Sequence, residues 1–367
     1  MNTTGTYESV NTFESSLESN TKDSDTFIWY STQIFTPTQR IIFFSVFLIL
    51  GLFGVFANGL TIFVIMKNKE LKKSPFNILL VSLCISDFLS ASNSSIQSYS
   101  LLWSLRAYTG PEFFCKLSHS VRVWTEYVTV QHILIFSIVR LYAMKCPMRV
   151  KRVFTPSMAT ITAAVIWLEV FLTAAIFRYI FPTVHPVQPD AEYSGCIAVP
   201  PEWKEALKLH KFTVPFMFFL PMSGIIGCAV YLAVTIYRMR HCDIPRTPSP
   251  DRIRNENKAI LQVSLIVLSF ILGYLGNAVN RVLVSLPIYY TIPLVSRSWF
   301  TFTCYLLLRL SECLNPVFYS LGSDTLMKAT KQLFSKEKLA PVGGRNKKLQ
   351  SSYNISGAVS RARKSAT

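Results

Sequence analysis

The chain has 367 residues, of which 50% are hydrophobic and only 16% are charged. Soluble domains average about 25% charged residues, so this composition excludes an ordinary soluble domain and favours lipid as the main solvent. The formal net charge of +17 does not indicate nucleic acid as a partner, because the basic residues concentrate in alternate loops and in the tail. We therefore expect a polytopic membrane protein.

Seven mostly apolar segments, each long enough to span a bilayer, follow one another along the chain. They cover residues 40–67, 75–102, 113–145, 157–181, 209–239, 258–287 and 297–321. The pattern predicts an all-α membrane protein whose seven-transmembrane helix bundle occupies residues 40–321. We expect an acidic, Ser/Thr-rich N-terminal segment at 1–39, a short amphipathic membrane-surface helix at 322–335 and a disordered tail at 336–367.

The distribution of Lys and Arg predicts the orientation of the bundle. The first, third and fifth connections and the tail are basic, and the positive-inside rule places them in the cytoplasm. The N-terminus is then extracellular, in agreement with Asn2-Thr3-Thr4, a glycosylation acceptor. Asn93 begins a second acceptor motif inside a predicted span, where we expect it to be unused. We expect a multi-pass protein of the plasma membrane.

Short motifs occur at characteristic places in the spans. They are Asn58, Asp87 in Leu83-Cys84-Ile85-Ser86-Asp87, Cys115, Trp167, Pro221 and Asn315-Pro316-x-x-Tyr319. In their order and spacing they resemble the rhodopsin-like G protein-coupled receptors over roughly residues 40–335. The resemblance implies a receptor, not an enzyme, that activates a heterotrimeric G protein through helix rearrangement. The residues it assigns to activation are Arg140, Pro221, Asn315, Pro316 and Tyr319.

The same topology places Cys115 near the outer surface of the membrane and Arg140 near the inner surface. The two residues are 25 positions apart, which corresponds to roughly 37 Å along a helix. Among the cysteines, only Cys115 and Cys196 are placed near the exoplasmic surface, so we expect them to form a disulfide. Two free thiols are the alternative.

Several positions depart from the family pattern. Val139 precedes Arg140 where the family usually has an acidic residue, which predicts raised basal signalling or a resting state secured by other contacts. In the sixth span, Tyr274 and Gly276 stand where the family has tryptophan and proline, and Ala229 replaces a tyrosine of the fifth span. These departures concern the activation relay and leave the fold prediction unchanged.

Ionisable side chains inside the spans are the candidates for a ligand site. Two interpretations stay open. In the first, Arg122–Glu126 and Arg309–Glu312 neutralise each other as structural pairs. In the second, Arg122, Arg281 and Arg309 present positive charge to an acidic group of the ligand. The candidate ligand-binding residues are Arg122, Glu126, Tyr274, Asn277, Arg281, Tyr305 and Arg309.

Two of these residues restrict the ligand class within the resemblance. Arg122 stands where amine receptors carry aspartate, and Arg309 stands where opsins carry the retinal-binding lysine. We therefore expect neither a biogenic amine nor retinal. An extracellular peptide, such as a neuropeptide or peptide hormone, fits the acidic N-terminal segment and the long second outer loop best. A small acidic or lipid ligand is the alternative.

Deeper in the bundle, four residues match the family's sodium site. They are Asp87, Thr129, Ser311 and Asn315. Oxygen ligands suit a hard cation, but Glu312 adds a second carboxylate, and a hydrated polar cluster without an ion is equally compatible. Apart from this allosteric sodium ion, we expect no metal and no cofactor. The other expected partners are membrane lipids and, after phosphorylation of the tail, arrestin and receptor kinases.

Other classes of protein fit the sequence less well. A seven-helix transporter or channel would predict duplicated halves, and the sequence has no internal repeat. An intramembrane enzyme would need a catalytic motif, and His132 stands alone in the third span, as expected of a packed, hydrogen-bonded residue. A receptor-like protein that binds ligand but signals poorly remains an alternative within the fold.

Overall fold

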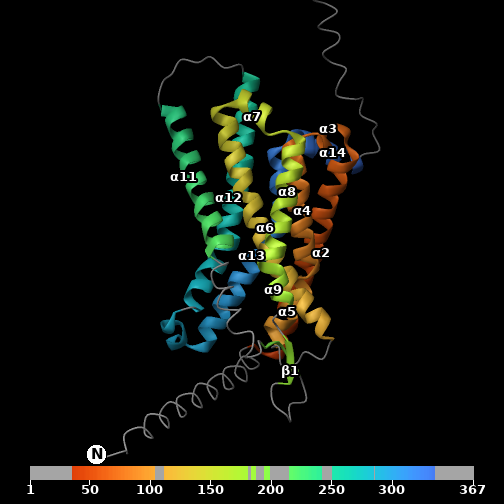
Figure 1. Ribbon diagram of the computed structural model, residues 1–367, viewed down its shortest axis with the longest axis vertical. Helices are drawn as coiled ribbons and strands as arrows, with labels where there is room; N and C mark the ends of the chain where they lie inside the picture. Colours follow the sequence, from red (N-terminus) through yellow and green to blue (C-terminus); the bar gives the residue numbers. More distant parts are fainter. Residues whose placement is uncertain are drawn as a thin grey trace, which may run out of the picture. The chain divides into compact units, whose positions relative to one another are not determined.

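The computed structural model describes residues 35–103, 111–180, 183–186, 194–198, 215–241, 250–284 and 286–334. Its packing divides the chain into two units, Met1–Leu326 and Met327–Thr367. The described part of the first unit contains seven long helical runs, which confirm the predicted all-α, seven-helix bundle (Figure 1).

Each helical run corresponds to one predicted span. The runs are α2 (Pro37–Lys67); α4 (Pro75–Ser92) with α5 (Ser94–Trp103); α6 (Glu112–Lys145); α8 (Pro156–Val170) with the π-helical η2 (Phe171–Ala175) and α9 (Ile176–Ile180); the π-helical η4 (Pro215–Phe219) with α11 (Leu220–His241); α12 (Pro250–Val284); and α13 (Leu294–Gly322). The most extensive contacts are those between α12 and α13 and between α2 and α4.

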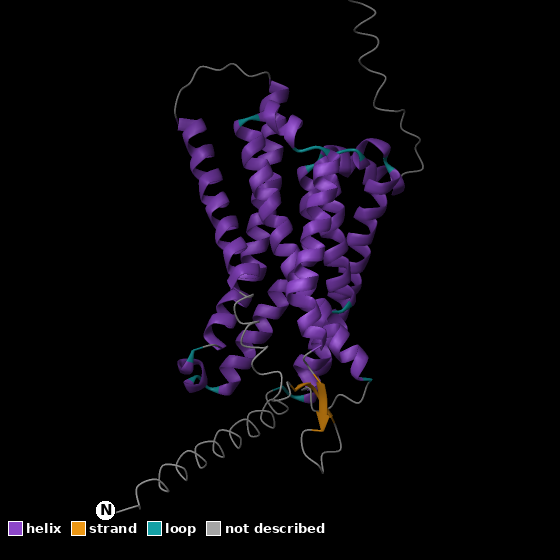
Figure 2. Ribbon diagram, viewed as in Figure 1, coloured by secondary structure: helices purple, strands orange, loops and turns teal. Residues whose placement is uncertain are grey.

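Shorter elements complete the described chain. They are α3 (Lys69–Lys72), α7 (Pro147–Val153), the 3₁₀ turn η5 (Pro287–Thr291), the strands β1 (Thr183–Pro186) and β2 (Ser194–Ala198), and α14 (Asp324–Phe334). The strands form an antiparallel hairpin, in which Val184 lies opposite Cys196 (Figure 2). The sequence did not predict this hairpin. It lies at the end of the bundle opposite to α3 and α7 (Figure 1).

The helix starts follow local chemistry. Thr36 caps α2: its hydroxyl accepts the Gln39 amide hydrogen at 3.3 Å, and its own amide donates to Oε1 of Gln39 at 2.9 Å. Such a reciprocal capping box satisfies backbone groups that the first turn leaves unpaired. Proline opens α2, α4 and α8, because the first helical turn does not need its missing N–H.

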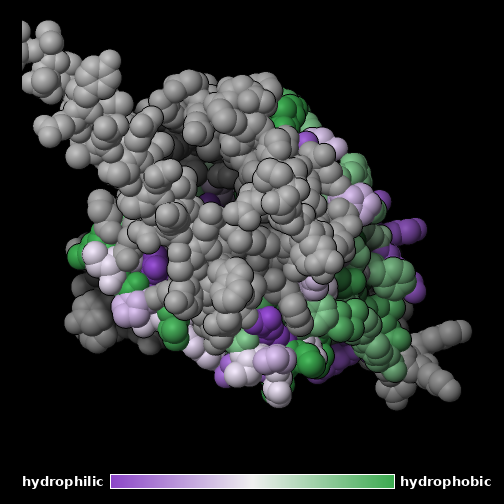
Figure 3. All heavy atoms as spheres, turned by 90° about the horizontal axis from the view of Figure 1, so that it is seen from below, coloured by the Kyte–Doolittle hydropathy of each residue, from purple (hydrophilic) through white to green (hydrophobic). Residues whose placement is uncertain are grey.

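The outside of the bundle is apolar, and its interior holds buried polar residues among apolar ones. On α2, Ile49 is 65% exposed and Leu52 is 64% exposed, whereas Asn58 is fully buried. Hydrophobic side chains also gather on the flank of the described surface in Figure 3. Within the described residues, four helical stretches meet length and composition criteria for crossing a membrane: Pro37–Lys67, Pro75–Ser92, Pro156–Ala175 and Phe216–Thr235. By contrast, α6 and α13 carry the buried ionisable residues Glu126, Arg309 and Glu312.

Glycine sets the distance between α12 and α13. A Cβ atom added at Gly273 would overlap the Ser311 side chain of α13, and one added at Gly276 would lie 3.0 Å from Sγ of Cys304. The next residue, Tyr274, is fully buried, and its ring stacks on Phe270 at 4.8 Å between centroids. The absence of a side chain at position 273 therefore lets α12 approach α13 closely.

We expect Gly273→Ala to destabilise the bundle by about 1–3 kcal/mol, because the added methyl group forces these two helices apart. Thermal melting of the detergent-solubilised protein measures the loss. Gly227→Ala on α11 is the matched control, since its new Cβ would meet no atom within 4 Å. Equal melting temperatures for the two variants would contradict this account of the packing.

Candidate functional site

The Glu126 carboxylate joins α6 to α12. Its Oε2 lies 2.6 Å from Nη2 of Arg281, and its Oε1 accepts a hydrogen bond from Nδ2 of Asn277 at 2.6 Å. The Arg281 guanidinium also lies over the rings of Phe218 and Tyr127, at 5.2 and 5.9 Å from their centroids. Glu126 is 3% exposed, so its negative charge depends on these two residues of α12.

Arg122 lies one helical turn before Glu126 and is half-buried. The predicted Arg122–Glu126 pair is not formed, because both oxygens of Glu126 are directed to α12. In the part of the chain that the structure describes, the Arg122 guanidinium forms no ion pair or hydrogen bond, although it interacts electrostatically with Glu126 and Arg281. Two guanidinium groups and one carboxylate leave this cluster with one net positive charge.

The predicted Arg309–Glu312 pair is formed. Nη1 of Arg309 lies 2.8 Å from Oε2 of Glu312, and both side chains are 3% exposed. Arg309 also donates to the Ser90 carbonyl at 3.0 Å and to Oε1 of Gln97 at 2.6 Å, and its guanidinium lies 4.8 Å from the ring centroid of Tyr305. The charge of Arg309 is therefore directed to α4, α5 and its own helix.

Two tyrosines complete this inner cluster. The Tyr274 hydroxyl donates to Oε1 of Glu312 at 3.4 Å, and the Tyr305 hydroxyl donates to Oε1 of Gln97 at 2.8 Å. Ser90 also donates its hydroxyl to Glu312 at 3.1 Å. Four helical elements, α4, α5, α12 and α13, thus meet around the Arg309–Glu312 pair, and sequence spacing did not identify Ser90 or Gln97 as its partners.

Hydrogen bonds connect three of the four residues predicted for a sodium site. Asp87 accepts hydrogen bonds from Thr129 at 3.3 Å and from Asn315 at 2.9 Å. The Ser311 hydroxyl instead donates to the Ser269 carbonyl of α12 at 2.8 Å. The described residues contain no group of three or more His, Cys, Asp or Glu side chains that could hold a metal. Sodium binding stays a prediction.

The predicted activation residues lie on three helices. Pro316 is inside α13, Pro221 lies on α11, and Arg140 lies on α6 with a side chain outside the described part. Tyr319 is fully buried, and within the described residues its hydroxyl has no hydrogen-bond partner.

His132 belongs to a hydrogen-bonded chain that links three helices. Its Nδ1 lies 2.8 Å from the Val128 carbonyl and its Nε2 lies 2.8 Å from Oγ of Ser82, which also accepts the indole N–H of Trp167 at 2.9 Å. Because a carbonyl can only accept, Nδ1 carries the hydrogen and Nε2 accepts from Ser82. Both ring nitrogens are used, which confirms the expected packed, hydrogen-bonded histidine.

The structure bears on the predicted disulfide and on one of the two glycosylation motifs. Cys115, at the start of α6, is disulfide-bonded, and Cys196 lies on β2, a strand that contacts α6. This arrangement supports the predicted pairing of the two. Asn2 lies outside the described residues. Asn93 is 7% exposed and donates to the Ser118 carbonyl at 2.7 Å, so its acceptor motif is buried in the bundle.

A helical bundle with an apolar exterior and buried ion pairs inside defines a polytopic membrane protein with an internal polar site. Residues 57–319 match the model of the 7 transmembrane receptor (rhodopsin family), and the chain belongs to this family. It is therefore a multi-pass G protein-coupled receptor of the plasma membrane, not an enzyme or a transporter. This result confirms the resemblance inferred from the motifs.

The sequence identity to individual relatives is low. The growth hormone secretagogue receptor type 1 of Oryctolagus cuniculus is 26% identical over 78% of this chain and 80% of its own length. The galanin receptor 2b of Danio rerio is 23% identical over 84% of this chain and 79% of its own length. The cysteinyl leukotriene receptor 2 of Mus musculus is 22% identical over 79% of this chain and 90% of its own length.

The buried Arg309–Glu312 pair leads to a prediction about the stability of the folded protein. Glu312→Gln leaves a buried guanidinium without its counter-charge, and we expect a loss of about 3–5 kcal/mol. The double variant Arg309→Met, Glu312→Leu removes both charges and should lose less. Thermal melting and surface expression of the two variants compare the losses, and a double variant that is less stable than the single one would contradict the argument.

Proposed function

We propose that this receptor responds to an extracellular peptide, such as a neuropeptide or peptide hormone, and activates its heterotrimeric G protein through helix rearrangement around Arg140. The observation that carries the proposal is the unmatched, half-buried charge of Arg122 beside the Glu126–Arg281 pair. The relatives named for growth hormone secretagogues and for galanin support a ligand of this class.

In this proposal the ligand enters between α6, α12 and α13. A carboxylate or sulfate of the peptide would bind Arg122, since a guanidinium pairs with such groups through two hydrogen bonds. Asn277, Arg281 and Tyr305 would contact the neighbouring part of the ligand.

A small acidic or lipid ligand is the second candidate. The free charge of Arg122 suits any carboxylate, and one relative is named for a cysteinyl leukotriene. A response to small acids without a response to peptides would favour this candidate.

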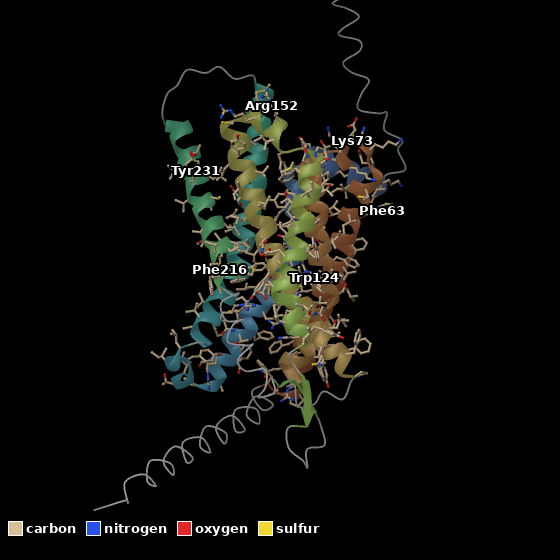
Figure 4. The ribbon with its side chains drawn as sticks, viewed as in Figure 1. Phe63, Lys73, Trp124, Arg152, Phe216 and Tyr231 are labelled. Carbon is tan, nitrogen blue, oxygen red and sulfur yellow. The ribbon has the colours of Figure 1, made fainter. Side chains whose placement is uncertain are left out.

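The proposed orientation places the N-terminus outside the cell and the C-terminus in the cytoplasm. Lys73 and Arg152, from the first and third basic connections, lie at the same end of the bundle, as this orientation requires (Figure 4). Arrestin and receptor kinases would then reach the tail, and the amphipathic α14 would contact membrane lipids.

The test of the proposed function is G protein activation in transfected cells, with and without a neuropeptide library. We expect Arg122→Gln to lower the potency of an activating peptide roughly tenfold or more, because it removes a charged hydrogen-bonding partner. Arg122→Lys keeps the charge but not the two parallel donors. The potency of the peptide at this variant should therefore lie between its potencies at the wild type and at Arg122→Gln.

Surface-expressed Arg140→Ala is the control for coupling. It should abolish the G protein response while peptide binding persists. A well-expressed wild-type receptor that is silent with every peptide would argue against a peptide ligand.

The proposed orientation predicts glycosylation at Asn2. Asn2→Gln should increase the gel mobility of the protein to that of the glycosidase-treated wild type. Asn93→Gln is the matched control and should leave the mobility unchanged, because Asn93 is buried between helices. A mobility that is unchanged in Asn2→Gln would contradict the orientation.

A further inference from the structure

Polar contacts between α6 and α12 centre on Glu126, and we call Glu126, Asn277 and Arg281 the Glu126 clasp. Both carboxylate oxygens are used, at 2.6 Å each, and each oxygen contacts a different residue of α12. Hydrogen bonds of this kind, in which the acceptor is ionised, are about twice as strong as those between neutral groups. The clasp therefore fixes α12 against α6 at two points one helical turn apart.

The clasp is distinct among the ion pairs of the described residues. Arg309–Glu312 lies within α13, at i and i+3, whereas Glu126–Arg281 joins two different helices. Glu126 is 3% exposed, and separating α12 from α6 would leave its carboxylate buried without a counter-charge on α12. Arg281 is 20% exposed, so this side of the clasp is the more accessible one.

Nothing comparable secures Arg140 from its neighbouring position, because Val139 carries no charge. Contacts elsewhere in the bundle are therefore the candidates to secure an inactive conformation. Arg122 lies one turn from Glu126, so a ligand that engages Arg122 lies next to the clasp and can alter it. A ligand shifts a conformational equilibrium only if it binds the two states differently, and breaking the clasp supplies such a difference.

We infer that the Glu126 clasp holds α6 and α12 in the inactive arrangement and that ligand binding activates the receptor by opening it. This inference rests on the proposed function, since it assigns the regulation of the same site. Glu126 acts here as a positioning residue, which sets the place of α12.

The first test measures G protein activation without any ligand, at matched surface expression. Glu126→Gln and Arg281→Gln should each raise the basal signal roughly tenfold, since each removes a charge-assisted contact that favours the inactive state. Glu126→Asp keeps the charge on a shorter side chain and should raise the signal less.

Glu169→Gln is the matched control. It makes the same chemical change at a half-buried carboxylate of α8, which accepts a hydrogen bond from Gln131 of α6 at 3.0 Å and does not join α12. Its basal signal should equal that of the wild type. A basal signal that is unchanged in Glu126→Gln, or equally raised in Glu169→Gln, would overturn the inference.

A second readout separates this failure from failure of the proposed function. Thermal melting of purified wild type, Glu126→Gln, Arg281→Gln and the double variant forms a double-mutant cycle, and residues in contact should give non-additive losses. Additive losses would overturn the clasp whatever the signalling. Non-additive losses with no G protein signal from any variant would instead reject coupling, and with it the gating role, while leaving the contact in place.

Discussion

The buried Arg309–Glu312 pair is the constraint on which the packing of the bundle depends. A charge in the membrane interior is costly unless it is paired and hydrogen-bonded, and this pair provides both within one turn of α13. The guanidinium still needs acceptors, which Ser90 and Gln97 supply. Meeting that need brings α4 and α5 against α13 and fixes the rotation of α13, so that its apolar residues face outward.

The inner pair and the Glu126 clasp are connected through α12. Tyr274 donates to Glu312 of the inner cluster, and Asn277, three residues later, donates to Glu126. Residues at i and i+3 lie on one face of a helix, so a single face of α12 serves both clusters. A rotation of α12 would disturb the two together, which gives a physical route from the outer site to the centre of the bundle.

The sequence predicted the fold well and the site only in part. Hydropathy and length identified all seven spans because lipid requires long apolar helices. Local spacing predicted Arg309–Glu312 correctly at i and i+3. The same spacing suggested an Arg122–Glu126 pair as one of two interpretations. That pair is not formed, because spacing along one helix carries no information about a competing partner on another. The turn of Ser311 toward Ser269 and the β1–β2 hairpin escaped prediction for the same reason, since both depend on how separate segments meet.

The sixth span, α12, lacks the proline that the family usually has, and side-chain contacts position it instead. Proline inside a helix removes a backbone hydrogen bond and imposes a bend, but Gly276 keeps its N–H, and α12 runs as one helix from Pro250 to Val284. The place of α12 is therefore set by side-chain contacts rather than by a kink. Gly273 allows its close approach to α13, and Tyr274 uses that approach to reach Glu312. Side-chain contacts, unlike a proline bend, can be exchanged for contacts with a ligand, so a bundle built in this way makes α12 the helix that ligand binding can move.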